Sequence, residues 1–206
     1  QLLRDGNAPD NTWLAALERS MAQLGVAVAA ARRRFIDSLN AACAVGTEPF
    51  PTAELMLHSD VGDQLKSAPA LDVEENYHIR LTENRRIDIE AGRTTFGIHR
   101  DDLECRHLTT SSPAERCSTG EQKALLISIV LANARLQALE RGTAPLLLLD
   151  EVTAHLDGLR REALFNEISE LGSQAWMTGT EDELFKPFGT RAQRFRVADA
   201  TVTPVH

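Results

Sequence analysis

The sequence lacks a phosphate-binding loop of the form G-x-x-x-x-G-K-[ST], in which backbone amides and a lysine hold the phosphates of a nucleotide. Gly92 and Gly97 have the required separation, but Ile98 and His99 follow them in place of a lysine. Lysine itself is scarce, and none of the three lysines follows a glycine: Lys66, Lys123 and Lys186. The chain by itself therefore has no loop of this kind for a nucleotide.

Long apolar runs are also missing. None approaches the ~18 to 20 apolar residues that a membrane-spanning helix needs, and the N-terminus has no signal-peptide layout. The chain starts at Gln1 in place of a methionine, which suggests a fragment of a longer protein. We therefore expect a cytoplasmic protein with no membrane partner.

Cysteine is rare, and Cys43, Cys105 and Cys117 are an odd, scattered set without C-x-x-C spacing. This favours a reduced compartment over a disulfide framework. His99 and His107 lie near two of the cysteines, but their spacing matches no zinc-ligand layout. The formal net charge of -8 means that the chain alone is no obvious nucleic-acid binder.

Residues 12–44 have the pattern of one long helix, with no proline from Thr12 to Glu48. Apolar residues recur at spacings of three and four, which keeps one stripe facing a partner. At ~1.5 Å per residue the helix would be roughly 50 Å long, which suits an arm of a helical hairpin. The alternative is a core helix of a bundle. Its basic cluster Arg32–Arg34 is more often a solvated face than a DNA contact. The apolar stripe comprises Trp13, Leu17, Met21, Leu24, Val28, Ala31, Phe35 and Leu39.

The rest of the chain alternates short apolar runs with helical patterns. An apolar run, a helical pattern and a second apolar run over residues 146–178 indicate a βαβ unit, and hence a parallel sheet. The predicted strands are 53–58, 103–108, 146–149, 175–178 and an edge hairpin within 194–202, and the further predicted helices are about 72–91, 118–139 and 158–171.

Polar motifs surround this unit. Leu146–Leu149 read as a strand buried on both faces, which delivers Asp150 and Glu151 to its carboxyl end, where open α/β sheets bind ligands. Asp150 has the position of a carboxylate that holds Mg²⁺ through water, and Glu151 that of a general base. Ser118 and the Gly120 amide open a helix whose free N–H groups can bind an anion.

Taken alone, Ser118 with Glu121 three residues later is also a common capping box, so that motif has a purely structural interpretation. The order and spacing of Ser118–Lys123, Asp150-Glu151 and Ala154–Asp157 form a specific pattern. This pattern resembles the C-terminal half of bacterial RecF recombination-mediator proteins, which are ABC-type ATPases related to the SMC chromosome proteins. Residues Gly97–Leu103 resemble the G-P-H-R-D-D-L hallmark of that family.

The resemblance implies an α/β fold, the C-terminal lobe of an ABC-type (P-loop NTPase-like) ATPase with a long-helix arm. Residues 1–95 would form the arm region, and 96–206 the lobe with signature, Walker B and D-loop. It further implies ATP and Mg²⁺ as cofactors, with Asp150 on the metal and Glu151 as the catalytic residue. The residues implied to contact ATP are Ser118, Thr119, Gly120, Gln122, Asp157 and Thr180.

Three positions depart from the family pattern. Ile98 replaces a proline, Cys117 replaces a leucine, and Thr180 stands where transporter-type relatives have a switch histidine. A histidine sensor of the γ-phosphate therefore cannot be assumed, although Thr180 can donate a hydrogen bond there.

The resemblance also implies a function. The full-length protein would dimerise on ATP, hydrolyse it slowly, bind duplex DNA or single/double-strand junctions, and act with RecR and RecO in loading recombinase at gapped DNA, in replication, repair and the SOS response. This chain alone is expected to be inactive, because it has no Walker A loop. The alternatives are another SMC-like or ABC-type ATPase, or a non-enzymatic interaction module in which Asp150 and Glu151 are structural.

Overall fold

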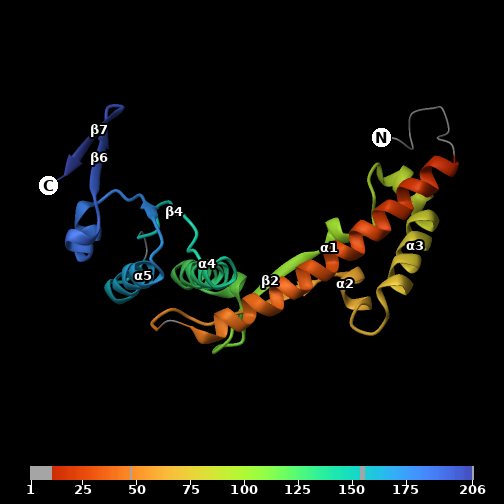
Figure 1. Ribbon diagram of the computed structural model, residues 1–206, viewed down its shortest axis with the longest axis horizontal. Coiled ribbons are helices and arrows are strands. Elements are labelled where there is room, and N and C mark those ends of the chain that lie inside the picture. The colour runs from red at the N-terminus through yellow and green to blue at the C-terminus, as the bar shows by residue number, and fades with distance from the viewer. Residues whose placement is uncertain (1–10, 47, 154–155, 206) are drawn as a thin grey trace. The chain divides into compact units, whose positions relative to one another are not determined.

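The computed structural model describes residues 11–46, 48–153 and 156–205 (Figure 1). The chain divides into two compact units, the first comprising residues up to Ala41 with Glu54–Arg106, the second Ala42–Ala53 with the residues from His107 onward. Both units thus take residues from either side of position 95. The functional division into an arm region (1–95) and an ATPase lobe (96–206) stays a prediction.

Helix α1 (Asn11–Val45) confirms the long helix expected over 12–44. Its small residues Ala22 and Ala29 are buried against α3 (Ala70–Ala91), which ends at Gly92 in the left-handed conformation, φ 67°, where the helix predicted over about 72–91 ends. Gly25 allows the closest approach, because a Cβ there would lie 2.5 Å from Tyr77 Cε1. The core of the first unit comprises Ala22, Val26, Ala29, Val61, Val73, Tyr77, Leu81 and Phe96.

Most of the apolar stripe of α1 is exposed in the part of the chain that the structure describes. Trp13 is 49% exposed and Leu24 69%, whereas Leu39, at the end of the stripe, is buried. By length and composition α1 is also the one helix among the described residues that could cross a membrane. A third of its most apolar window (33%) is buried, and core helices pass the same test, so this is weak support for a membrane contact.

A small sheet has the strand order β1-β2-β3. Strands β1 (Ala53–His58) and β2 (Asp102–His107) confirm the predicted strands to within one residue, and β3 (Ser112–Pro113) was not expected. Short helical segments that the sequence analysis did not predict lie next to these strands in the sequence: α2 (Asp60–Gln64) after β1, η1 (Ile98–Arg100) before β2 and η2 (Ala114–Arg116) after β3.

The second unit contains the expected βαβ crossover. Strands β4 (Leu147–Leu149) and β5 (Ala175–Met177) pair in parallel, and α5 (Gly158–Leu171) connects them. Helix α4 (Thr119–Arg141) precedes the crossover and ends at Gly142, φ 71°. Buried side chains of both helices pack on one face of the strand pair, and Phe165 of α5 stacks on Phe188 with ring centroids 3.7 Å apart.

Strand β4 is not buried on both faces within this chain, contrary to the sequence interpretation. Leu147 is buried against the helices, but Leu148 is 73% exposed and its register partner Trp176 58% exposed. The reason is that α4 and α5 cover only the Leu147 face of the two strands. The described chain ends in the irregular η3 (Asp182–Arg191) and the hairpin of β6 (Arg194–Ala198) and β7 (Thr201–Val205), which confirms the predicted edge hairpin.

Candidate functional site

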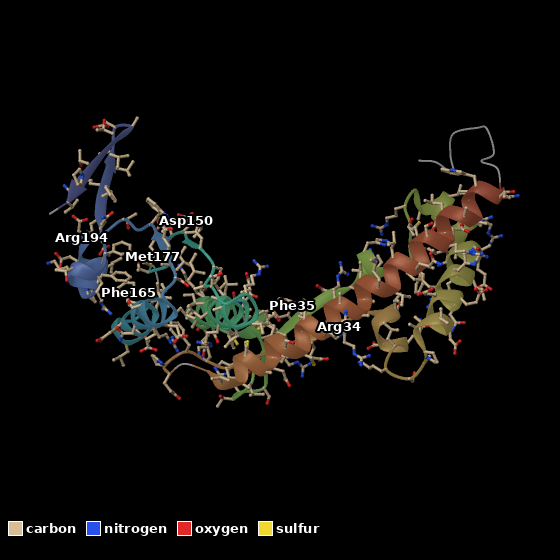
Figure 2. All side chains as sticks on the ribbon, in the orientation of Figure 1. Arg34, Phe35, Asp150, Phe165, Met177 and Arg194 are labelled. Atoms are coloured by element: carbon tan, nitrogen blue, oxygen red, sulfur yellow. The ribbon has the colours of Figure 1, made fainter. Side chains whose placement is uncertain are left out.

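Asp150 lies directly after β4, at the carboxyl edge of the parallel strand pair. The Thr178 hydroxyl, one residue beyond β5, donates to Asp150 Oδ1 at 2.5 Å, and the Thr178 N–H donates to Leu149 O at 3.1 Å. Because parallel strands end at one edge, the register fixes this pairing (Figure 2 labels Asp150 and Met177 at this end). Asp150 is therefore an exposed carboxylate whose orientation is set by a neighbouring strand.

Glu151 follows in an unusual backbone conformation. Its φ is 48°, in the left-handed region that residues other than glycine rarely adopt. The Glu151 N–H donates to Thr178 Oγ1 at 2.9 Å, and its carbonyl accepts a hydrogen bond from Lys123 Nζ at 2.5 Å. Its side chain is exposed, so the carboxylate can accept a proton from a water molecule.

Ser118 forms a complete capping box at the start of α4, which confirms the structural interpretation of that motif. Its hydroxyl donates to Glu121 Oε2 at 2.8 Å and its N–H to the same oxygen at 2.9 Å, while the Glu121 N–H donates to Ser118 Oγ at 3.3 Å. These hydrogen bonds from Ser118 hold the pKa of Glu121 below its usual value. Ser118 could donate to a phosphate only after releasing the Glu121 carboxylate.

The other residues predicted to contact ATP lie at exposed ends of elements. Thr119 and Gly120 form the first turn of α4. Gln122 Nε2 donates to the carbonyl of Cys117 at 3.1 Å and so supports the preceding loop. Asp157 caps α5 by accepting from the Arg160 N–H at 2.8 Å.

Thr180 lies exposed beyond β5, and its side chain has no hydrogen bond among the described residues. Thr178 holds Asp150 instead. The sequence analysis missed Thr178 and gave Lys123 no role. A polar residue following a strand that pairs in parallel with the Asp150 strand was the available signal for Thr178. Ala154 and His155, part of the proposed D-loop, lie outside the described residues.

The hallmark loop, defined as Gly97–Asp102, lies in the first unit and is held from two helices. Arg32 of α1 donates to Ile98 O at 2.6 Å and to Asp101 Oδ2 at 2.8 Å. Ile98 N–H donates to Tyr77 Oη of α3 at 3.3 Å, a contact that a proline at this position could not make. The loop is thus fixed by side chains far away in the sequence.

The donor set fits Mg²⁺ and ATP only in part. Within the described ranges no group of three or more histidine, cysteine or acidic residues could hold a metal ion. Magnesium bound through one carboxylate, water and substrate phosphates needs no such group, and Asp150 fits that role. The amides opening α4 suit an anion, but the phosphate loop is missing.

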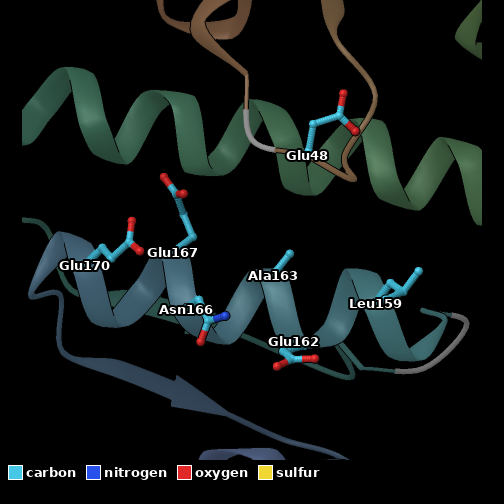
Figure 3. Close-up of a pocket in the computed structure, with 7 residues that line it drawn as sticks. All are labelled: Glu48, Leu159, Glu162, Ala163, Asn166, Glu167 and Glu170. Atoms are coloured by element: carbon cyan, nitrogen blue, oxygen red, sulfur yellow. The ribbon is translucent and has the colours of Figure 1, made fainter.

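A pocket of about 330 Å³ lies elsewhere in the second unit, along α5 (Figure 3). Its lining includes the carboxylates of Glu48, Glu162, Glu167 and Glu170, and none of the motif residues. Glu167 is paired with Arg135, and the other three acidic side chains repel a polyphosphate, so this pocket does not serve as the nucleotide site.

Comparison with known proteins gave relatives over nearly the whole chain, although no family model matches. The chain is 49% identical over 206 residues to the DNA replication and repair protein RecF of Mesorhizobium japonicum, covering 99% of this chain and 54% of the relative. It is 48% identical over 204 residues to RecF of Rhizobium etli, covering 98% and 54%. The chain thus spans about half the length of the curated relatives it matches.

The fold is also known. The structure described as the recombination mediator protein RecF-ATP in the RecFOR pathway matches with a TM-score of 0.73, over 98% of this chain and 52% of that chain, at 18% identity. A second structure, of RecF with ATPrS, matches equally well, with a TM-score of 0.73 over 97% of this chain. At this identity the likeness establishes the fold alone, the α/β fold that the chain shares with these two structures.

Proposed function

Nearly the whole chain corresponds to the C-terminal half of proteins of the RecF family, and from this correspondence we propose its function. The chain is part of an ATP-dependent, DNA-binding recombination and repair protein. That protein dimerises on ATP in the cytoplasm and helps to load recombinase at gapped DNA together with RecR and RecO. The relatives' names, DNA replication and repair protein and recombination mediator, support this proposal.

The observation that carries the proposal is the arrangement at the carboxyl edge of β4 and β5. Thr178 orients the Asp150 carboxylate, and the adjacent Glu151 side chain is open to water. Mg²⁺, when bound, neutralises charge on the transferred phosphoryl group. Asp150 would hold the ion through water, and Glu151 would orient the attacking water and accept its proton.

The start of α4 supplies the other half of the proposed site. Ser118, Thr119, Gly120 and Gln122, with Asp157 of the D-loop, would contact the nucleotide held by the opposite subunit. N–H groups at a helix start stabilise negative charge, which supports this role. ATP sandwiched in this way would couple binding to dimerisation, while Thr180 would face the γ-phosphate.

The test is Glu151→Gln in the full-length protein. We expect intact ATP binding, a dimer that persists on ATP, and hydrolysis slower by about 10² to 10⁴-fold, because an amide cannot accept the proton. Glu140→Gln is the control, since Glu140 is an exposed residue of α4 remote from the motifs. Hydrolysis at the wild-type rate by Glu151→Gln would show that Glu151 is not the base.

Ser118→Arg tests the contact across the dimer. A bulky cation at this position should block ATP-driven dimerisation in sedimentation experiments, while each monomer still binds nucleotide. If Ser118 only caps α4, dimerisation should fall only in proportion to the folded fraction measured by thermal melting of the same variant. A folded Ser118→Arg protein that dimerises normally on ATP refutes the contact.

A further inference from the structure

Lys123 connects the start of α4 to the segment that follows β4 through one hydrogen bond. It lies one turn into α4, in the signature turn, defined here as Ser118–Lys123, and its Nζ donates to the Glu151 carbonyl at 2.5 Å. The next two residues, Ala124 and Leu125, are fully buried, so this part of α4 is anchored in the core of the second unit. A displacement of the helix start therefore displaces the group that holds the Glu151 backbone.

Glu151 depends on such a tether. Its φ of 48° costs an L-residue about 1–2 kcal/mol relative to the right-handed region, and such conformations persist where the surroundings hold them. Strand β4 ends at Leu149, so Glu151 lies beyond the strand ladder. Side chains of α4 and of the residue after β5 hold its peptide groups instead: Thr178 accepts from the N–H, and Lys123 donates to the carbonyl.

We propose that Lys123 is a positioning residue that holds Glu151 of its own chain in place for hydrolysis and links it to the signature turn. This rests on the proposed function, in which the signature turn contacts the opposite subunit's nucleotide and Glu151 acts on its own. Lys123 then connects the two ATP sites of a dimer through one side chain. Thr178 positions the other peptide group of Glu151 by accepting a hydrogen bond from its N–H.

The competing role for Lys123 is a direct phosphate contact across the dimer. Lysine has three donors, and a hydrogen bond to a carbonyl leaves two of them for other acceptors. The two roles differ in which chain must carry the lysine. A positioning lysine acts on Glu151 of the same chain, whereas a phosphate contact acts on the site completed by the other chain.

Mixed dimers of the full-length protein separate these roles. In the first mixture, Lys123→Met chains are mixed with an excess of Glu151→Gln chains. The chain that carries the one active Glu151 of each mixed dimer then lacks Lys123.

In the second mixture, wild-type chains are mixed with an excess of chains that carry both substitutions. The chain with the active Glu151 then keeps its own Lys123, and the opposite chain lacks it. The reference is wild type with excess Glu151→Gln.

We expect single-turnover hydrolysis in the first mixture to fall by about 10 to 100-fold, the range for a small misplacement of a catalytic group, and the second mixture to match the reference. Lys123→Arg, which keeps a donor, should restore most of the rate in the first mixture. Lys186→Met is the matched control, because Lys186 is an exposed lysine paired with Glu183. A slow second mixture and a normal first one would assign Lys123 to the phosphates and overturn the proposal, as would two normal mixtures.

A readout without ATP keeps the test independent of the proposed function. Amide exchange of the peptide that contains Asp150–Thr153 should be faster in Lys123→Met than in wild type, and unchanged in Lys123→Arg. Unchanged exchange in Lys123→Met refutes the tether. If the reference mixture does not hydrolyse ATP but amide exchange is faster in Lys123→Met than in wild type, the tether is retained and the ATPase function is rejected.

Discussion

The hallmark loop and the signature turn are held by contacts of very different range. In the first unit, Arg32 of α1 and Tyr77 of α3 contact Ile98 of the loop from 66 and 21 residues earlier in the sequence. In the second unit, Ser118 and Glu121 close the capping box within one helical turn. The loop thus depends on the packing of α1 against α3, whereas the turn is largely self-contained. A substitution in the hallmark loop should therefore destabilise much of the first unit, whereas one in the signature turn should destabilise only the start of α4.

The largest effect is expected from Gly97→Ala. Gly97 has φ 133° and ψ 178°, a region open essentially to glycine, and a Cβ there would lie 2.2 Å from Tyr77 Oη. We expect a loss of about 3 kcal/mol or more in the free energy of unfolding of the first unit, from backbone strain and the displaced ring. Amide exchange across α1 and α3 of the full-length protein measures it.

Gly158→Ala is the control for Gly97→Ala. Gly158 opens α5 with open space around its missing Cβ, and alanine favours a helix. It should be neutral or slightly stabilising. Exchange that rises only within residues 94–102 after Gly97→Ala would mean that the loop is as local as the signature turn, and the comparison would fail.

Arg32→Met should have the next largest effect. It removes the partner of Asp101, whose side chain is only 5% exposed, and leaves a buried carboxylate without its cation. Because Arg32 itself is 43% exposed, we expect the lower range for such losses, about 1–3 kcal/mol. Urea unfolding of the full-length protein, monitored by exchange in the hallmark loop, measures this loss.

The matched control is Arg34→Met, on the same helix and without a described contact. Equal stability of the Arg32→Met and Arg34→Met proteins would remove the Arg32 contact from the comparison. A larger loss in Arg32→Met alone would place the stabilisation of the hallmark loop on α1.

The contrast in range also explains which parts of the structure the sequence predicted. The ends of α3 and α4 could be predicted because glycines at 92 and 142 adopt the left-handed cap, a local requirement. The crossover could be predicted because apolar runs and a helical pattern alternate in the sequence. Asp150 and Glu151 could be placed at a sheet edge because they follow directly after β4.

Tertiary contacts decided the rest. The buried side of α1 uses Ala22, Gly25 and Ala29, where the ring of Tyr77 and its neighbours approach closely, so the larger residues of the stripe stay exposed. The sequence has apolar residues on both sides of α1 and does not indicate which side is buried. Thr178 could not be chosen over Thr180 without the register that places it beside Asp150.

Ser118→Ala should cost less than either change in the hallmark loop. Removal of the hydroxyl breaks the cap on the Glu121 N–H, which typically costs about 1 kcal/mol. Amide exchange should rise within the first turn of α4 and not beyond, since Ala124 and Leu125 remain packed in the core. A loss of protection that reached α5 would contradict the local character of the signature turn.

Acidification should produce the smallest effect and isolates the charge in the capping box. Hydrogen bonds from Ser118 lower the pKa of Glu121 below its usual 4.5, so the native state favours the ionised carboxylate. A lowered pKa contributes stability above the unfolded-state value, and that contribution is lost as the pH falls through the lower folded-state value.

Glu121→Gln keeps an acceptor at the third helical position but cannot titrate. The other carboxylates titrate in both proteins. The melting temperature of wild type should therefore fall relative to that of Glu121→Gln as the pH is lowered from about 6 to about 3. A difference that is independent of pH would mean that the charge of Glu121 adds nothing to the stability of the capping box.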